Sequence, residues 1–525
     1  MPVFDRSGAV IKLALHAPNG YAPKAYGERK SESDSSRYTF PPEPLSVQEL
    51  RAAIPDLKFT DDLKGWYNGF VDWFYESERQ KRKSSSPPAH EGPEPRREFQ
   101  LEGINWLPWA KRGLLGDQPG LGKTNQLATA IDYSRPVLIA ALGESLEQWR
   151  DEIDMWMGIE SVIIEGERPQ REHLLRLQPK VMLINHEMLR TKYWPNVFAR
   201  RYGTLIIDEV HKFQGRDSLM TAGARAIATT PGTEYVWLAT GSPIWNNPDS
   251  LWQLLNLIAP KRFTSYWTFA EYFCQIDYTQ WGMTIAGANT QRIPLLQQVL
   301  APLMLRRLKT DPRIAKELPA IQKPIIYHYE LSPPQRRQYK DARRNAGDYE
   351  GQVTTLSTLR SICNLPHLHG CNTDPKAKLF LDVMAQFEGH QVVVFTWHVA
   401  VAHHVAKLLG TEAVVAAGVG DEWVAKFRKG EVKHIVGTIA SMGTSHNLHD
   451  AGCCIVVFYE EDFVPTMNEQ ARQRVEQRMG QKNVTSVYHL IGRNTKEQSI
   501  HNISTRRKDV ADQITAVRLI WEEAE

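Results

Sequence analysis

Residues 116–124 read GDQPGLGKT, and this short stretch decides how the rest of the chain is interpreted. It ends in Gly122-Lys123-Thr124, as a phosphate-binding loop should, although the strict pattern has glycine where Asp117 stands. The apolar pair Leu114-Leu115 precedes the loop, and a helical pattern begins at Asn125. A strand, a glycine turn and a helix N-terminus in this order predict a cradle for phosphate groups.

Each part of such a loop has its own role. Backbone N–H groups around Gly120 and Gly122 are expected to hold the phosphates, helped by the helix dipole. Lys123 is expected to reach the β and γ oxygens, and the hydroxyl of Thr124 to ligate Mg²⁺.

A second motif lies at the end of the apolar segment 204–207, where Asp208 and Glu209 follow. Open α/β sheets bind ligands at the carboxyl ends of their strands. Asp208 is therefore expected to hold Mg²⁺, directly or through water, and Glu209 to orient and deprotonate an attacking water. The alternative is a surface Asp-Glu turn after a core strand, but Lys123 upstream favours the nucleotide site.

Length and net charge limit the number of domains and the kinds of partner that can be expected. A length of 525 residues exceeds one ordinary core, so two or three domains are expected. The net charge of +3 does not indicate nucleic-acid binding, which would have to depend on local basic clusters that also fit solvated helix faces. These clusters are Arg306-Arg307-Leu308-Lys309, Arg336-Arg337, Arg343-Arg344 and Arg506-Arg507-Lys508.

The cysteine content and the apolar segments of the sequence indicate the cellular compartment. Five cysteines in a chain of this length predict no disulfide framework and a reducing environment. The first 18 residues lack the form of a signal peptide, and no run approaches the length of a membrane helix. We expect a protein of the cytoplasm of a bacterium or a virus-infected cell, or of the nucleus in a eukaryote.

Residues 78–97 are charged and rich in serine and proline. We expect a linker there, placed at 81–96, between an N-terminal extension (1–80) and the main body. Within the extension, aromatic residues recur at helical spacing, which favours an amphipathic core helix over a platform for stacking bases. They are Trp66, Tyr67, Phe70, Trp73 and Phe74.

The main body predicts an α/β fold with parallel sheets. Continuous apolar runs, typical of strands buried on both faces, alternate with helical patterns. The runs are 136–140, 181–184, 205–207, 236–239, 392–395, 434–437, 454–457 and 487–490. They fall into two groups, which predict one sheet domain at 97–310 and another at 311–525.

The loop resembles the D-E-M-G-L-G-K-T segment of the Swi/Snf family of DNA-dependent ATPases, within helicase superfamily 2. Asp117 fits that pattern and becomes a candidate nucleotide contact, whereas Gln118 and Pro119 depart from it. The segment 97–107 resembles the family's preceding motif, whose glutamine reads adenine, so the resemblance makes Gln100 a candidate adenine contact.

Further segments resemble the family in the family's order. Gln148-Trp149 matches the next motif, and Gln148 is a candidate nucleic-acid contact. Asp208-Glu209-Val210-His211 resembles a D-E-A-H box with one conservative change. The segment 239–247 resembles T-G-[ST]-P-x-x-N, which couples two lobes, and 305–311 resembles the crossing into the second lobe.

The second lobe resembles the family more loosely. Residues 441–448 resemble A-G-G-x-G-x-N-L, with Met442 and Ser445 where glycines are usual; the resemblance makes Ser441, Gly443 and Asn447 candidate nucleic-acid contacts. Residues 470–481 resemble Q-A-x-x-R-x-x-R-x-G-Q, with the two arginines four apart rather than three. Here the resemblance implies nucleotide contact by Gln470 and stabilisation of γ-phosphate charge by Arg478, with Arg474 its partner.

The resemblance covers about residues 97–500. It implies two tandem RecA-like lobes that use ATP and Mg²⁺ to translocate on duplex DNA, in a monomer that a targeting protein could direct, and a compact member of bacterial or phage type. One alternative is a strand-separating DNA or RNA helicase, with an exposed aromatic pin within 264–282. Another is a non-enzymatic, nucleotide-gated DNA-binding protein, motivated by Met442, Ser445 and the lengthened arginine motif.

One short segment, 363–371, offers ligands for zinc. Cys363, His367, His369 and Cys371 are ligand types that zinc accepts. Their spacing is not that of a usual finger, and the segment resembles a helical stretch of the Swi/Snf second lobe that binds no metal. We therefore expect no zinc there.

Overall fold

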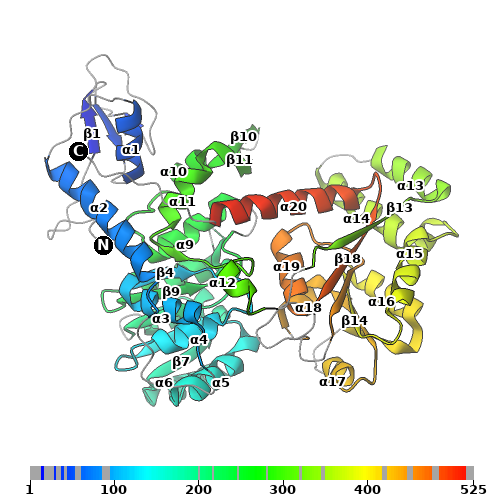
Figure 1. Cartoon of the computed structure of the whole chain (residues 1–525), viewed down its shortest axis with the longest axis horizontal. Coiled ribbons are helices and arrows are strands. Elements are labelled where there is room, and N and C mark those ends of the chain that lie inside the picture. The colour runs from blue at the N-terminus through cyan, green and yellow to red at the C-terminus, as the bar shows by residue number, and fades with distance from the viewer. Residues whose placement is uncertain are drawn as a thin grey trace. The chain divides into compact units, whose positions relative to one another are not determined.

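The computed structural model of the chain is shown in Figure 1. It describes residues 13–16, 29–30, 37–40, 44–53, 61–84, 95–198, 202–215, 218–244, 247–279, 282–318, 322–344, 349–416, 422–445, 448, 453–475 and 484–515. The chain forms two compact units. Unit 1 is Met1–Leu308 together with Val510–Glu525, and unit 2 is Lys309–Asp509.

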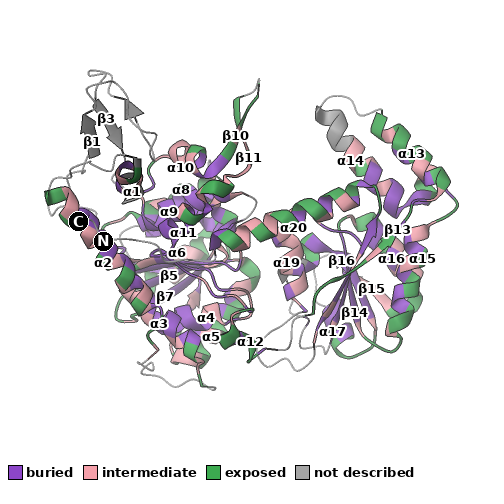
Figure 2. Cartoon of the chain, turned by 45° about the horizontal axis from the view of Figure 1, so that its top comes forward, coloured by how far each residue is buried: buried purple, intermediate pink, exposed green. Residues whose placement is uncertain are grey.

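Unit 1 is built on a seven-stranded parallel sheet with the strand order β12-β4-β9-β8-β5-β7-β6. The strands are β4 (Arg112–Leu115), β5 (Val137–Ala141), β6 (Val162–Ile163), β7 (Val181–Asn185), β8 (Thr204–Ile207), β9 (Tyr235–Ala239) and β12 (Met304–Leu305). The central strands are buried along their whole length, as Figure 2 shows, because helices cover both faces of the sheet.

Successive side chains of each strand enter two separate cores. Leu138 and Ala140 of β5 face one core, and Val137 and Ile139 face the other. Helices of the first core are α7 (Tyr193–Phe198), α8 (Leu219–Ala228), α9 (Leu251–Ile258), α10 (Tyr266–Phe273) and α11 (Ile293–Leu300). Helices of the second are α3 (Glu98–Ala110), α4 (Lys123–Ala130) and α5 (Leu146–Met157). The short helix α6 (Arg168–Arg176) precedes β7.

Smaller elements complete unit 1. The N-terminal part holds a three-stranded antiparallel sheet of β1 (Leu13–His16), β3 (Arg37–Phe40) and β2 (Arg29–Lys30), followed by α1 (Pro44–Ala53) and α2 (Asp61–Gln80). An antiparallel hairpin of β10 (Cys274–Thr279) and β11 (Gly282–Ala288) extends from α10 (Figure 1).

The aromatic pattern in α2 is confirmed as that of a core helix. Phe70 and Phe74 are fully buried, and Trp66 and Tyr67 nearly so. Helix α2 continues through Gln80, so the first three residues of the charged segment 78–97 are helical rather than a loop. Residues 85–94 of the expected linker lie outside the described residues.

Unit 2 contains a six-stranded parallel sheet with the order β13-β18-β17-β14-β16-β15. Its strands are β13 (Ile325–Tyr329), β14 (Val392–Thr396), β15 (Ala413–Ala416), β16 (His434–Thr438), β17 (Ile455–Phe458) and β18 (Ser486–Gly492). One face packs against α15 (Pro375–Met384) and α16 (Val399–Leu409), and the other against α17 (Glu422–Arg428), α18 (Ile439–Ser445) and α19 (Pro465–Gln473).

Four further helices belong wholly or partly to unit 2: α12 (Pro312–Ala315), α13 (Pro333–Arg344), α14 (Tyr349–Asn364) and α20 (Lys496–Thr515). Helices α13 and α14 pack beside the end of β13 through Tyr329, Tyr339 and Ile362. The last residues of α20, from Val510 on, are counted with unit 1.

The α/β fold class with parallel sheets is confirmed, and each of the two units is built on one parallel sheet. All eight predicted apolar runs are strands of the two large sheets: β5, β7, β8, β9, β14, β16, β17 and β18. None of the helices in the described part of the chain combines the length and apolar character that a bilayer span requires.

Candidate nucleotide-binding site

The loop Gly116–Gly122 connects β4 to α4. Gly120 and Gly122 adopt left-handed backbone angles, with φ of 85° and 76°, which side-chain-bearing residues rarely accept. The ammonium group of Lys123, the first residue of α4, donates a hydrogen bond to the backbone oxygen of Asp117 at 2.9 Å. Lys123 is therefore folded over the loop, where a phosphate would meet it.

Asp117 anchors the loop from beneath. Its Oδ1 accepts hydrogen bonds from the backbone N and Nε of Arg307, both at 3.0 Å, and its Oδ2 accepts from the Arg307 guanidinium at 2.5 Å. Gln126 of α4 donates to the same Oδ2 at 3.1 Å. Asp117 is fully buried, so its carboxylate joins the loop to the segment after β12.

Arg306, the neighbour of Arg307, joins the loop 116–122 to the segment around Gly241. Arg306 donates to the backbone oxygens of Gly116, at 2.8 Å, and Gly241, at 3.0 Å. Arg307 and Lys309 are also buried. The prediction that the cluster 306–309 is either a nucleic-acid patch or a solvated face was therefore wrong, because the two arginines hold backbone loops in place.

The two carboxylates follow β8 at the carboxyl end of the sheet. Asp208 Oδ2 accepts a hydrogen bond from the indole N–H of Trp149, and Oδ1 accepts from the backbone N of Glu209, both at 2.9 Å. Burial, together with the charge of Glu209, raises the pKa of Asp208 to about 6, although Trp149 and Lys123 act in the opposite direction.

Glu209 has a backbone conformation that is costly for its residue type. Its φ of 44° is left-handed, and such angles in residues other than glycine concentrate at functional sites. Burial lowers the pKa of Lys123, while the negative charges of Glu209, Asp208 and Asp117 raise it. Lys123 and the two carboxylates therefore share one electrostatic environment inside unit 1.

A chain of contacts leads from Glu209 to the segment after β9. Nδ1 of the buried His211 lies 3.1 Å from Oε2 of Glu209 and 3.1 Å from Oγ1 of Thr240. Oγ1 of Thr240 also accepts a hydrogen bond from the backbone N of Ser242 at 3.1 Å. A displacement of the Glu209 carboxylate would therefore also displace the Thr240–Ser242 backbone through these contacts.

The same segment touches the phosphate loop directly. A Cβ atom placed on Gly241 would lie 2.4 Å from Cγ of Pro119, a distance that real Cβ atoms do not show. Gln214 also donates to the backbone oxygen of Pro243 at 2.8 Å. Phosphate loop, carboxylate pair and Gly241 segment thus form one packed assembly.

The structure places the other predicted residues of unit 1 as follows. Gln100 is buried in the first turn of α3 and donates to the backbone oxygen of Leu121 at 3.4 Å, so it lies beside the loop. Thr124 is partly buried at the start of α4. Gln148 is exposed on α5, whereas its neighbour Trp149 is buried against Asp208.

In unit 2, Ser441 lies on α18, exposed, and its backbone N donates to Oγ1 of Thr438 at 3.1 Å. Gly443 is within the same helix. Met442, which stands where a glycine is usual, is fully buried in the core against Gly437, so its side chain serves packing. Asn447 lies outside the described residues.

The predicted arginine motif begins on α19. Gln470 is partly buried near the end of this helix, and Arg474 follows its last residue. The backbone oxygen of Arg474 accepts a hydrogen bond from the backbone N of Leu448 at 2.9 Å, which joins this motif to the Ser441 segment. Arg478 lies outside the described residues.

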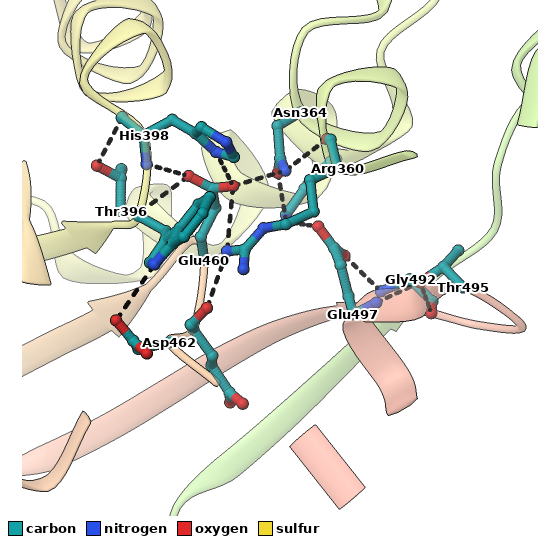
Figure 3. Close-up of polar contacts among 12 residues, drawn as sticks. Arg360, Asn364, Thr396, His398, Glu460, Asp462, Gly492, Thr495 and Glu497 are labelled. Atoms are coloured by element: carbon teal, nitrogen blue, oxygen red, sulfur yellow. Dashed lines mark hydrogen bonds and ion pairs between the residues drawn. The ribbon is translucent and has the colours of Figure 1, made fainter. Parts of the chain in front are cut away.

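Unit 2 also holds a buried polar network that sequence analysis missed. Glu460, two residues after the end of β17, accepts hydrogen bonds from the backbone N atoms of Trp397 and His398 at 2.9 and 3.0 Å, and from Asn364 at 2.9 Å (Figure 3). The Arg360 guanidinium contacts the same carboxylate. Burial alone would raise the pKa of Glu460, but the hydrogen bond from His398 and the Arg360 charge hold it at about 2.

The cysteines and histidines of the candidate zinc segment 363–371 have other contacts. Cys363 is buried in the apolar cluster around Tyr329 and Tyr339. Nε2 of His369 lies 2.9 Å from Oγ of Ser361, and the ring of His367 lies beside that of His404.

Comparison with known proteins adds a family match. A family model described as SNF2-related domain matches residues 70–375. A probable chromatin-remodeling complex ATPase chain of Oryza sativa subsp. japonica is 28% identical over 455 residues, which cover 77% of this chain and 39% of that protein. The ISWI chromatin-remodeling complex ATPase CHR11 of Arabidopsis thaliana is 27% identical over 455 residues, with coverage of 77% and 41%.

This chain thus spans about two fifths of the length of those two curated relatives. Among solved structures, the Sulfolobus solfataricus SWI2/SNF2 ATPase core in complex with dsDNA matches with 21% identity and a TM-score of 0.41. The match covers 83% of this chain and 95% of that one.

Proposed function

This chain belongs to the SNF2-related domain family, and from that premise we propose that it is an ATP-driven motor that moves along duplex DNA. The observation that carries the proposal is the convergence of Lys123, Asp208 and Glu209 in unit 1. Curated relatives named as chromatin-remodeling ATPases, and a similar structure described in complex with dsDNA, are in keeping with it.

The residues present fit a nucleoside triphosphate. Gly120 and Gly122 have left-handed backbone angles, which let the loop before α4 turn so that its backbone N–H groups can contact phosphate oxygens. Lys123 would exchange its hydrogen bond to the Asp117 oxygen for contacts with the β and γ oxygens. Thr124 and Asp208 would hold Mg²⁺, which supplies charge neutralisation on the phosphates when bound.

Glu209 is proposed to orient and deprotonate the attacking water. Its contact with His211, and through it with Thr240, offers a route by which the state of the γ-phosphate reaches the backbone of Ser242. Such a route is what a motor needs, because hydrolysis must alter the protein at a distance.

Unit 2 is proposed to supply the remaining parts. Arg474 and Arg478 are the candidates to stabilise charge on the γ-phosphate, with Gln470 as a further nucleotide contact. Ser441, Gly443 and Asn447, together with Gln148 of unit 1, are proposed to touch the DNA backbone. Backbone contact predicts weak sequence preference and a strong dependence on salt.

ATP hydrolysis measured with duplex DNA, single-stranded DNA and RNA tests the proposal. We expect strong stimulation by duplex DNA, and a fall of at least about a hundredfold in Lys123→Ala, because one charged contact to the transition state is lost. Lys192→Ala, which alters an exposed lysine of the same unit, is the matched control. No turnover despite intact DNA binding would instead identify a nucleotide-gated DNA-binding protein.

One observation favours strand separation as a second candidate function. The hairpin β10–β11 carries Tyr278, which is 79% exposed, close to its turn. An exposed aromatic ring can stack on a base and so stabilise a separated pair. If the hairpin acts as a pin, Tyr278→Ala abolishes unwinding of a tailed duplex yet spares DNA-stimulated ATP hydrolysis, whereas Thr284→Ala on the same hairpin changes neither.

A further inference from the structure

Three ligand-type side chains from separate segments of unit 2 converge on one point. Glu461 follows β17, His489 lies in β18, and His501 lies in α20. Their candidate ligand atoms all lie within 4.8 Å of one another. Nδ1 of His501 lies 2.8 Å from Oε1 of Glu461, and Nδ1 of His489 contacts the same oxygen.

The cluster is held in place before any ligand arrives. The side chains of Glu461, His489 and His501 are only 6%, 11% and 19% exposed. The His489 ring stacks on Phe458 with an interplanar angle of 3°, and Arg360 donates to the backbone oxygen of Glu461 at 2.8 Å. Rigid support of this kind is what a metal site requires.

Two imidazole nitrogens and one carboxylate oxygen are a ligand set for first-row transition metals, zinc above all. We propose that Glu461, His489 and His501 bind one divalent transition-metal ion, with zinc preferred and water completing the coordination. This site is separate from the proposed nucleotide site, whose Mg²⁺ ligands Thr124 and Asp208 belong to unit 1.

A bound ion requires these side chains to adjust. Zinc–nitrogen bonds of about 2.0 to 2.1 Å place tetrahedral ligand atoms roughly 3.3 Å apart. In the cluster, Nδ1 of His501 lies 2.8 Å from Oε1 of Glu461, and the three ligand atoms lie within 4.8 Å of one another. His501 is the most exposed of the three, so a rotation of its ring on the surface of α20 can open the site. The bound ion would then tie α20 to β18 and to the segment that follows β17.

The test uses the full chain without a histidine tag, stripped with a chelator and titrated with zinc chloride alone in a calorimeter. We expect one zinc ion per chain and a higher melting temperature with zinc, because an ion that binds only the folded state stabilises it. His501→Gln should weaken zinc binding at least tenfold and abolish the rise in melting temperature. His403→Gln, an exposed histidine of α16, should change neither.

Two further variants make the result decisive. Circular dichroism of His501→Gln shows whether loss of binding reflects loss of folding, and Glu461→Gln provides a second ligand change with nearly the same volume. Lys123→Ala should keep full zinc binding, so failure of the motor function and failure of the metal site are distinguishable. If the original chain binds no zinc, or if Glu461→Gln and His501→Gln bind it as tightly, the cluster is only a hydrogen-bonded triad and the proposal is overturned.

Discussion

Asp117 shows at the scale of one residue why this phosphate loop departs from the strict pattern. Breaking a buried ion pair by removing one partner costs about 3 to 5 kcal/mol, because the other charge is left without compensation. We expect Asp117→Asn to lower the free energy of unfolding of unit 1 by up to about 3 kcal/mol, since Arg307 loses the nearer of its two charged partners and keeps only Glu102, 3.5 Å away. Urea unfolding followed by tryptophan fluorescence measures the change.

The exposed Asp132, in the turn before β5, supplies the control Asp132→Asn, which should shift stability by less than about 0.5 kcal/mol. The double change Asp117→Asn with Arg307→Met should cost less than the sum of the two single changes. An additive double variant would show that the two side chains do not depend on each other.

Thr240 provides a second prediction, about coupling rather than stability. Thr240→Val keeps the shape of the side chain but removes the hydroxyl that contacts His211 and accepts from the backbone N of Ser242. We expect turnover of ATP to fall roughly tenfold or more with nucleotide affinity little changed, because a buried partner lost in this way costs about 1 to 3 kcal/mol. Steady-state kinetics of ATP hydrolysis with duplex DNA separates the two parameters.

Thr240→Ser keeps the hydroxyl and should remain within a few-fold of the original chain. Equal turnover in the valine and serine variants would remove Thr240 from the proposed route between Glu209 and Ser242.

Candidate site residues were recognisable from sequence where a motif is contiguous. Lys123, Asp208 and Glu209 each stand in a short pattern whose chemistry is evident from residue type. The side chains that hold the site in place could not be recognised in this way. Arg307 lies 190 residues from its partner Asp117, and Trp149 lies 59 residues from its partner Asp208. Only the folded sheet brings such pairs together, so no short sequence pattern predicts them.

At the scale of elements, the contact between the Gly241 segment and the phosphate loop leads to a third prediction. Gly241→Ala would press a methyl group into Pro119, so the loop must move away from its place before α4. We expect nucleotide affinity to fall at least about tenfold while unit 1 stays folded, as measured by binding of a fluorescent ATP analogue and by circular dichroism.

Gly232→Ala is the matched control, since a Cβ atom there meets nothing within 4 Å. It lies in the turn before β9, in the same unit, and should leave binding unchanged. Unaltered affinity in Gly241→Ala would mean that the loop adapts without loss.

Elements were predictable to the extent that burial leaves a pattern. The central strands β5, β8, β14 and β17 are largely apolar because both of their faces are covered, although β8 begins and β14 ends with a threonine. Edge strands such as β15 are only partly buried, and the exposed hairpin β10–β11 packs little of its surface. With little apolar surface to bury, these segments carry no periodic signal.

At the scale of the whole molecule, pH should act on unit 2 through Glu469. Burial alone would raise the pKa of Glu469, but the charges of Arg472 and Lys508 hold it below the usual range near 4.5. Lys508 of α20 donates to its Oε2 at 2.8 Å, and Arg472 of α19 donates to Oε1 at 2.9 Å. The carboxylate thus joins two helices only while it is ionised.

Because the folded pKa is depressed, this stabilisation is present above pH 4.5 and is lost as the pH falls below it. We expect Glu469→Gln to lower the urea midpoint at pH 7 and to reduce the further loss on acidification. Glu187→Gln, which removes an exposed pair with Arg190, should leave the pH profile unchanged. A parallel profile for Glu469→Gln and the original chain would contradict the prediction.

The closing residues of α20 have a consequence for how the molecule is made. Ile514 is fully enclosed in the core of unit 1, and the backbone oxygen of Gln513 accepts a hydrogen bond from Gln297 of α11. A ribosome releases these residues only after all of Lys309–Asp509 has been synthesised. The first lobe to emerge is thus the last to be finished, and its nascent form keeps an apolar gap exposed while the second lobe is still being translated.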